Sequence, residues 1–105
     1  MSYVDGFVLP VPKKNLAAYR RMATKAGKIW REHGALEYHE CVADDVKPGE
    51  VVLFSWIVYK SRAQRDSVNK KVMSDPRLAD MMNPKALPFD GRRMFWGGFK
   101  PLIEL

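Results

Sequence analysis

The sequence predicts an α+β fold of the ferredoxin-like class, in which a four-stranded antiparallel sheet carries two helices on one face. The order of the predicted elements leads to this prediction. Strand-like and helix-like segments follow one another in the order βαββαβ, which is the split βαβ arrangement. The third strand-like segment has apolar residues on both faces, although the two helices can cover only one face of a sheet. With 105 residues and 47% hydrophobic content, the chain suits a single domain over residues 1–105.

The N-terminal half supplies a strand, a helix and a second strand. Residues 3–9 (YVDGFVL) alternate weakly as a strand that Pro10 ends. Asn15 then caps a helix that Gly34 ends in a left-handed conformation. Residues 35–43 alternate as the second strand. The apolar residues of the helix recur at the spacing of one helical face: Leu16, Tyr19, Ala23, Ala26, Trp30 and His33.

The strongest strand pattern is residues 51–59 (VVLFSWIVY), which follow the turn-forming residues 44–50. One side of this strand carries Val51, Leu53, Ser55, Ile57 and Tyr59, and the other carries Val52, Phe54, Trp56 and Val58. An exposed aromatic face of this kind is rare in soluble monomers. We therefore expect the face away from the helices to meet a second copy of the sheet, a hydrophobic ligand or nucleic-acid bases.

The C-terminal half completes the order with a second helix and a fourth strand. Ser61 and Gln64 form a capping box for a helix that continues for about three turns. Asp75 and Pro76 are suited to start a further short helical turn. Residues 92–100 are predicted to form the last strand.

Charge and cysteine content narrow the classes of function. The net charge of +6 invites a nucleic-acid partner, but the lysines and arginines follow the two predicted helices, as on solvated helix faces. No apolar run is long enough to span a membrane, and the N-terminal residues lack a secretory pattern, so we expect a cytoplasmic protein without a membrane partner. Cys41, the single cysteine, excludes an intrachain disulfide and is expected to be a small buried hydrophobe.

Several stretches closely resemble the YbaA-like family of small bacterial proteins, a domain of unknown function in the dimeric α/β-barrel superfamily. They are YVDGFVLPVP, GALEYHECVADDV, VLFSW, MSDPR and PFDGRRMFWGGF, and together they run over nearly the whole chain. The resemblance implies a ferredoxin-like subunit that pairs sheet against sheet as a homodimer. One departure is the connection at residues 44–50, which is shorter here than is usual in the family.

Asp5 is the first candidate functional residue, because a carboxylate within an apolar strand needs a partner and suits a general base or a ligand anchor. The alternative is an exposed or salt-bridged strand residue. Glu40 is a second, weaker carboxylate candidate. We expect a small pocket, between sheet and helices or at the dimer seam, with Asp5 and Arg93 as polar anchors. Its expected apolar lining is Phe7, Trp56, Met94 and Trp96.

The stretch PFDGRRMFWGGF raises two further expectations. Arg92 and Arg93 are expected to point to opposite sides of the sheet, where one of them anchors an anion with the help of Asp90 or Asp5, or forms a structural ion pair. Consecutive glycines inside a strand, Gly97-Gly98, indicate a bulge or a close approach of the backbone to another group.

Function itself is left open among three alternatives. The first is a ligand-binding or stress-associated homodimer that is not an enzyme. The second, by analogy with the superfamily, is a cofactor-free monooxygenase or isomerase. The third is an RNA-binding sheet, since FSWIVY has the aromatic spacing of an RNA-recognition motif, but Val52 and Leu53 replace the basic-glycine opening of that motif. His39, Glu40 and Cys41 are strand neighbours that point to opposite faces, so no metal site is expected, and no cofactor motif is present.

Overall fold

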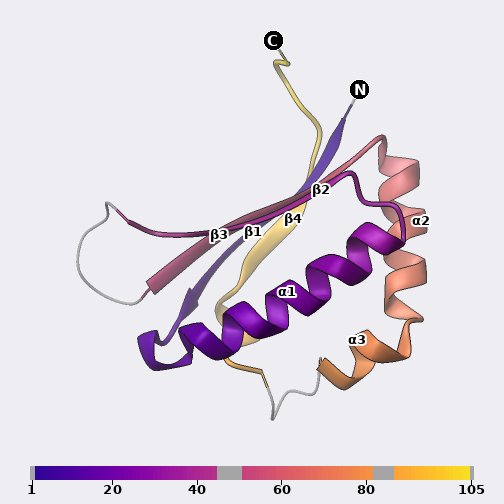
Figure 1. Cartoon of the computed structure of the whole chain (residues 1–105). Helices are drawn as coiled ribbons and strands as arrows, with labels where there is room; N and C mark the ends of the chain where they lie inside the picture. Colours follow the sequence, from indigo (N-terminus) through magenta and orange to yellow (C-terminus); the bar gives the residue numbers. More distant parts are fainter. Residues whose placement is uncertain (1, 45–50, 82–86, 105) are drawn as a thin grey trace.

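The computed structural model describes residues 2–44, 51–81 and 87–104. Its four strands form one antiparallel sheet in the order β2-β3-β1-β4. Three helices lie on one side of this sheet (Figure 1), which confirms the predicted ferredoxin-like class. The elements are β1 (Tyr3–Val11), α1 (Leu16–Glu32), β2 (Glu37–Val42), β3 (Val51–Tyr59), α2 (Arg62–Met73), α3 (Pro76–Met81) and β4 (Phe95–Phe99).

The first strand and the first helix begin and end differently from the predictions. β1 continues through Pro10 to Val11. The pairing between β1 and β4 ends at Val8. Beyond it, that edge of β1 has no described strand beside it, so the backbone N–H that Pro10 lacks is not needed for a hydrogen bond between strands. Asn15 stands before α1 but its side chain does not cap the helix, because its Nδ2 donates to the Pro88 carbonyl at 3.0 Å. Gly34, with φ of +117°, does end α1 as predicted.

The last strand is shorter than predicted. A 3-10 turn, η2 (Gly91–Arg93), replaces its first residues, and β4 starts only at Phe95. The Asp90 carboxylate starts this turn by accepting the backbone N–H of Arg92 at 3.0 Å. Arg92 and Arg93 therefore do not point to opposite faces of the sheet, because they do not lie on a strand.

The second helix begins as the sequence predicts. The Ser61 hydroxyl accepts the backbone N–H of Gln64 at 3.1 Å, and the Gln64 side chain accepts from the Lys60 backbone. Gln64 also donates through Nε2 to the Gly34 carbonyl at 2.9 Å, which ties the start of α2 to the end of α1. None of the described helices is long and apolar enough to cross a membrane.

The hydrophobic core lies between the helices and one face of the sheet. Alternation along β3 sends Leu53, Ser55, Ile57 and Tyr59 into this layer, where each is at most 4% exposed. The 3.6-residue period of α1 supplies Tyr19, Ala23 and Ile29 from the opposite side. α2 and α3 close one end of the layer with Val68, Val72 and Leu78.

The opposite face of the sheet carries no helix and is apolar. Its register brings Val8 beside Phe54 and Phe95, and Val4 beside Val58 and Phe99. Four of its large side chains are well exposed: Val8 (38%), Phe54 (56%), Phe95 (71%) and Phe99 (51%). The two-sided apolar pattern of residues 51–59 thus leaves an uncovered surface, which we call the open face.

Two predictions, that Cys41 is buried and that the glycine pair forms a bulge, are not met in the structure. Cys41 is exposed, because alternation along β2 points it to the open face beside Phe54. Gly97 and Gly98 lie in regular register with β1 and form no bulge. A Cβ at Gly98 would lie 2.9 Å from both the Arg65 guanidinium and the Tyr3 ring, so the close approach is the alternative that holds.

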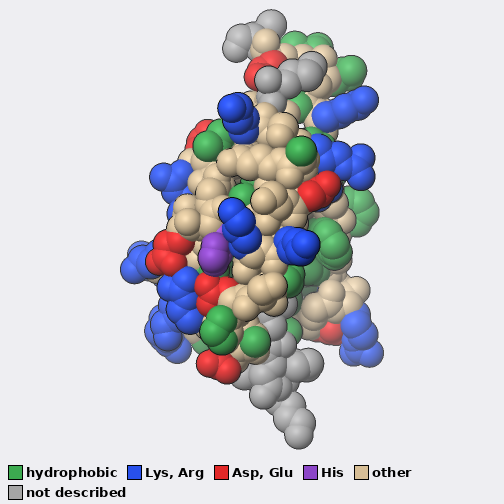
Figure 2. All heavy atoms as spheres, turned by 90° about the vertical axis from the view of Figure 1, so that its right-hand side faces the viewer, with side chains coloured by type: hydrophobic (Ala, Val, Ile, Leu, Met, Phe, Trp, Pro, Cys, Tyr) green, Lys and Arg blue, Asp and Glu red, His purple; other side chains and the backbone are tan. Residues whose placement is uncertain are grey.

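Charge is mixed on one side of the surface. On the side of the molecule shown in Figure 2, lysine and arginine side chains are spread among acidic ones and do not gather in a single patch. The Arg77 guanidinium, for example, contacts Glu32 at 2.6 Å and Asp75 at 2.8 Å. These contacts hold the pKa of both carboxyls below their usual range.

Candidate functional site

A cavity of about 320 Å³ lies between the helix-covered face of the sheet and the helices. Aromatic rings and aliphatic side chains form most of its wall. The polar lining groups are few and come from four separate elements: Asp5 on β1, Glu40 on β2, Ser55 on β3 and Asn69 on α2. A mainly apolar hollow with a small number of placed polar groups is the usual form of a small-molecule site.

Asp5 is a buried carboxylate with an ion-pair partner. It is 3% exposed, and its Oδ1 accepts from Arg65 Nη1 at 2.8 Å. Arg65 comes from the first turn of α2 and is held further by Asp66 at 2.8 Å and by the ring of Tyr3, 4.9 Å from the guanidinium carbon. Gly98 pairs with Asp5 across the strands and leaves room for this arrangement. Asp5 is thus a buried carboxylate, as the first interpretation of the sequence expects. It is also salt-bridged, as the alternative interpretation expects.

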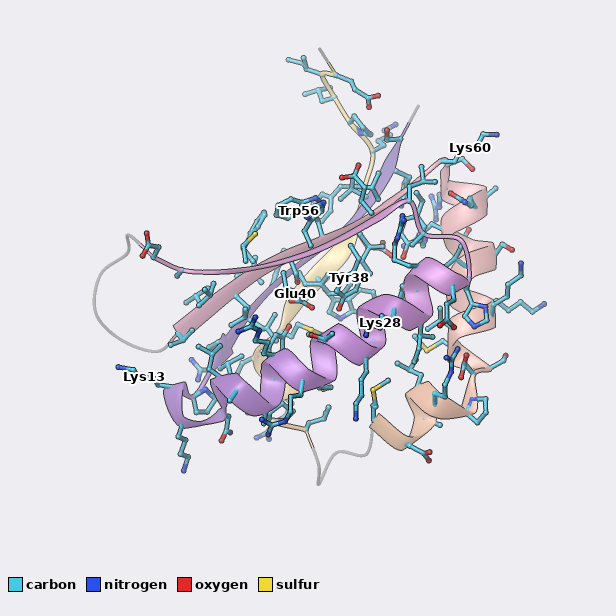
Figure 3. The ribbon with its side chains drawn as sticks, viewed as in Figure 1. Lys13, Lys28, Tyr38, Glu40, Trp56 and Lys60 are labelled. Carbon is cyan, nitrogen blue, oxygen red and sulfur yellow. The ribbon has the colours of Figure 1, made fainter. Side chains whose placement is uncertain are left out.

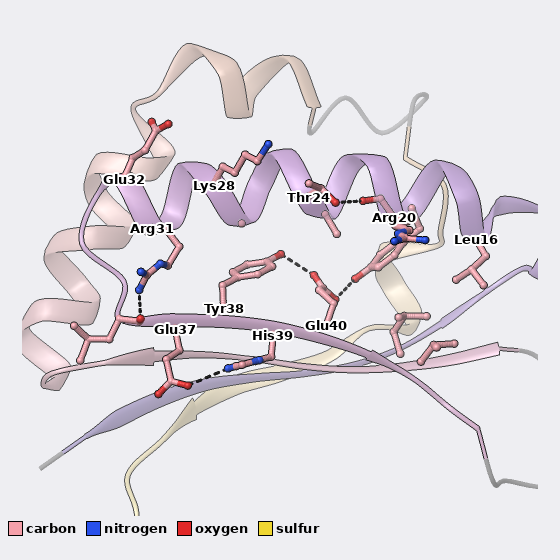
Figure 4. A pocket seen from close by; sticks show the side chains of 16 residues that line it. Leu16, Arg20, Thr24, Lys28, Arg31, Glu32, Glu37, Tyr38, His39 and Glu40 are labelled. Carbon is pink, nitrogen blue, oxygen red and sulfur yellow. Dashed lines mark hydrogen bonds and ion pairs between the residues drawn. The ribbon is translucent and has the colours of Figure 1, made fainter.

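Glu40 is held by two tyrosine hydroxyls. Tyr19 on α1 donates to Oε1 at 2.8 Å, and Tyr38, two residues earlier on β2, donates to Oε2 at 2.6 Å (Figure 4). Burial, and then the negative charge of Glu40, raises the pKa of both tyrosines, so both remain hydrogen-bond donors over the physiological range. We call these three residues the tyrosine–glutamate cluster.

Gly27 on α1 makes room for this cluster. A Cβ at that position would lie 2.7 to 3.2 Å from three atoms of the Tyr38 ring. Because such distances are too short for real contacts, a larger residue would move the ring and its hydroxyl away from Glu40. The sequence offers a weak sign of this role, since a glycine within an apolar helix face usually has a packing reason.

Asn69 forms a third polar point in the wall. Its Oδ1 accepts from Trp30 Nε1 at 3.1 Å and from the Tyr59 hydroxyl at 3.3 Å. Burial, together with the nearby Asp5 carboxylate, raises the pKa of Tyr59. These bonds satisfy the polar atoms of α1, β3 and α2 where the elements meet, and they fix the aromatic side chains that surround the cavity.

The structure brings together four of the six residues predicted for the pocket. Asp5, Phe7, Met94 and Trp96 line the cavity, and the rings of Phe7 and Trp96 stack at 6.5 Å. Trp56 does not belong with them.

Trp56 lies on the open face, where its ring stacks on His39 at 4.8 Å. Figure 3 shows it on the side of the sheet opposite to Tyr38 and Glu40. The reason is the two-residue period of β3, which puts Trp56 on the other face from its neighbours Ser55 and Ile57. Arg93, in the exposed η2 turn, is also not among the described lining residues.

An outer groove of about 1140 Å³ runs between α1 and the edge strand β2 (Figure 4). Its described lining carries charges of both signs, from Arg20, Lys28 and Arg31 and from Glu32, Glu37 and Glu40. Tyr38 and Glu40 line both this groove and the inner cavity. The tyrosine–glutamate cluster therefore stands in the wall between the two. Among the described residues, no group of three or more His, Cys, Asp or Glu side chains is placed to hold a metal ion.

Comparison with known proteins gives a family match and a set of similar folds. The model of a family of proteins of unknown function, DUF1428, matches residues 2–51 and 46–91. The uncharacterized protein YbaA of Escherichia coli K12 is 45% identical over 118 residues, which cover 99% of each chain. The two matched ranges meet at residues 46–51, at the end of the connection formed by residues 44–50. Residues 45–50 of that connection lie outside the described ones.

Three solved structures illustrate the fold. A dimeric ferredoxin-like protein from an uncultured marine organism has a TM-score of 0.68 at 10% identity, covering 99% of this chain and 98% of that one. SnoaB, a cofactor-independent oxygenase from Streptomyces nogalater, has a TM-score of 0.70 at 12% identity and covers 99% and 96%. A NIPSNAP domain protein from Burkholderia xenovorans has a TM-score of 0.67 at 11% identity and covers 94% and 93%. At these identities the likeness concerns the fold alone.

Proposed function

Since this chain belongs to the DUF1428 family of proteins of unknown function, we propose its function from the cavity: it binds a small, largely apolar molecule between its sheet and its helices. The observation that carries the proposal is a hollow of about 320 Å³ whose wall is mostly apolar and contains only a few polar groups. Its volume lies at the small end of the range for ligand pockets, which suits a molecule with one or two rings.

Two kinds of side chain in the cavity wall would contact the ligand. Phe7 and Met94, which are partly buried, and Trp96, which is 61% exposed, offer apolar and aromatic contact. An aromatic pair adds up to about 1.5 kcal/mol beyond area burial. Asp5 offers a polar anchor, because its ion pair with Arg65 fixes the carboxylate in place while it lines the cavity. Trp56 and Arg93 have no part in this proposal.

A cavity-filling variant tests the proposal. With 1-naphthol as the probe, the fluorescence of the lining residues Trp30 and Trp96 should change saturably in the wild type. Ala26→Phe places a ring in the cavity and should weaken binding at least about tenfold, since it removes most of the available volume. Ala17→Phe, on the exposed side of the same helix, is the matched control and should bind as the wild type does. Equal binding by both variants would place the probe elsewhere and overturn the proposal.

We also propose that two copies pair through their open faces to form a homodimer. The exposed Phe54, Phe95 and Phe99 support this, because burying them would release several kcal/mol at about 25 cal/mol per Å². The similarity to a dimeric ferredoxin-like protein supports it too. Light scattering over a dilution series should give the mass of two chains, and a monomer at all concentrations would contradict the proposal.

We place this homodimer in the cytoplasm. The free thiol of Cys41 suits a reducing compartment, where a free cysteine is not drawn into disulfides. Recovery of the native protein in a periplasmic or secreted fraction would contradict this assignment.

A further inference from the structure

We propose that the cavity selects molecules with a positively charged amine and seats the ammonium at Glu40, beside the hydroxyls of Tyr19 and Tyr38. This inference rests on the proposed function and specifies the class of ligand. It starts from a contrast of charge. The whole protein carries a net charge of +6, but the cavity has the opposite character.

The charge inside the cavity is negative. Its described lining residues include two carboxylates, Asp5 and Glu40, and no lysine, arginine or histidine. Asp5 is compensated by Arg65 at 2.8 Å. Glu40 takes part in no ion pair with any described residue, and its hydrogen bonds come from two neutral hydroxyls. Among the described residues, one carboxylate in the wall therefore has no ion-pair partner, which favours a cationic ligand and opposes an anionic one.

The tyrosine–glutamate cluster keeps this charge in place. Because the pKa values of Tyr19 and Tyr38 are raised, both hydroxyls stay protonated and donate to the carboxylate. Two such bonds fix the orientation of the Glu40 carboxylate. A carboxylate has about four acceptor positions, so two remain after the tyrosines are bound. A primary ammonium, with three donors, can use them.

Aromatic rings line the same cavity. The rings of Trp30 and Tyr38 are 6.4 Å apart with a tilt of 39°, and those of Tyr19 and Phe89 meet edge to face at 5.7 Å. The negative faces of such rings attract ammonium groups, and aromatic cages of this composition bind them in other proteins. The outer groove differs, because Arg20, Lys28 and Arg31 line it together with acidic side chains, whereas the described lining of the inner cavity carries no basic side chain.

The test compares three probes of similar shape on the wild-type protein by titration calorimetry at pH 7. They are 2-phenylethylamine, which is a cation, 2-phenylethanol, which is neutral, and 3-phenylpropionate, which is an anion. The amine should bind about tenfold more tightly than the alcohol, since a charge-assisted bond is roughly twice as strong as a neutral one. The anion should bind most weakly.

Glu40→Gln identifies the responsible group. It removes the charge but keeps an oxygen that can accept from a tyrosine, so the amine should lose its advantage while the alcohol binds within about twofold of its wild-type affinity. Glu37→Gln is the matched control on the same strand. Its carboxylate is exposed, pairs with His39 at 3.0 Å and does not line the cavity, so the preference for the amine should remain.

The outcomes separate the two proposals. If the alcohol binds as tightly as the amine to the wild type, the inference fails while the pocket survives. If neither these probes nor 1-naphthol binds, the proposed function fails as well. Because the wild-type comparison needs no variant, the result stands even if Glu40→Gln does not fold, which circular dichroism would report. An amine preference that persists in a folded Glu40→Gln protein would also overturn the assignment to this residue.

Discussion

The two faces of the sheet differ in where they keep their polar groups. The helix-covered face buries Asp5, Ser55 and the Tyr59 hydroxyl, and each has a partner or lies in the cavity wall. The open face carries Phe54, Phe95 and other apolar side chains, and its polar members are confined to the edge strand β2. In the described part of the chain, no buried side-chain nitrogen or oxygen lacks a hydrogen-bond partner.

This difference shows how the two faces of one sheet can be suited to two different kinds of binding. Polar groups that are buried within a protomer can be satisfied by its own helices, as Arg65 on α2 satisfies Asp5. Polar groups on a face that is buried only on association would depend on the partner, so that face favours apolar residues. The covered face thus suits recognition of a small molecule, and the open face suits self-association.

The largest expected effect comes from placing the same charge on each face of β3. Ile57→Asp buries a carboxylate beside Asp5, its cross-strand neighbour, and should cost more than about 4 kcal/mol, enough to unfold many small domains. Trp56→Asp, one residue earlier, should leave the protomer folded and convert the dimer to a monomer. Urea unfolding and light scattering measure the two effects. A folded Ile57→Asp protein, or a dimeric Trp56→Asp protein, would contradict the division between the faces.

The fold was largely predictable because its signals are local. The period of two over residues 51–59 and the period of 3.6 over α1 can be read from neighbouring residues, and so can the Ser61–Gln64 cap. The two-sided apolar pattern of β3 indicated an uncovered face. Local signals failed where a distant partner competed, as when Asn15 bonds to the Pro88 carbonyl in place of its own helix.

The site was predictable only in part, because it depends on how distant segments meet. The sequence shows that Asp5 needs a partner, but Arg65 lies 60 residues away and is selected by the packing of α2. The sequence predicts that Trp56 and Phe7 line one pocket. The register places Phe7 opposite Ser55 and therefore sends Trp56 to the other face of the sheet. The hydrogen bond between Tyr19 and Glu40 depends on the exact rotation of α1 about its axis. The spacing of apolar residues shows which helix face is buried, but it does not fix this rotation closely enough to predict a single hydrogen bond.

A smaller but still large effect is expected from the buried ion pair of the covered face. Arg65→Met leaves the Asp5 carboxylate 3% exposed and without a cation, so the free energy of unfolding should fall by about 3 to 5 kcal/mol. Arg62→Met, three residues earlier and exposed, is the control and should change it by less than about 0.5 kcal/mol. Urea denaturation measures both.

A double variant shows whether the ion pair or the packing is responsible. Adding Asp5→Leu to Arg65→Met removes the stranded charge and should restore part of the lost stability, because replacing both partners by apolar groups is often tolerated. If Arg65→Met proves as harmless as Arg62→Met, Asp5 does not need its partner. The claim that the helices stabilise the buried polar groups of the covered face would then be contradicted.

The smallest expected effect comes from the glycine pair of β4, whose members point to opposite faces. Gly98 faces the helices, and a methyl group there would crowd the Tyr3 ring and the Arg65 guanidinium, so Gly98→Ala should cost about 1 to 2 kcal/mol. Gly97 faces the open side, where a Cβ would meet only Phe99 at 4.0 Å. Neither glycine has a positive φ, so the backbone itself accepts alanine at both positions. Gly97→Ala should therefore change stability by less than about 0.5 kcal/mol.

This comparison is best made in the Trp56→Asp background, where a monomer keeps the dimer seam from contributing to the measured stability. The two alanine variants then differ only in the face that receives the methyl group. If their urea midpoints coincide, the crowding at Gly98 is relieved by movement of the Tyr3 side chain at no cost. Tyr3 would then not be needed to hold Arg65 against Asp5, and the carboxylates of Asp5 and Asp66 would be enough to fix the guanidinium. If Gly98→Ala is the more harmful, the glycine is required because the polar contacts on the covered face leave no space for a side chain.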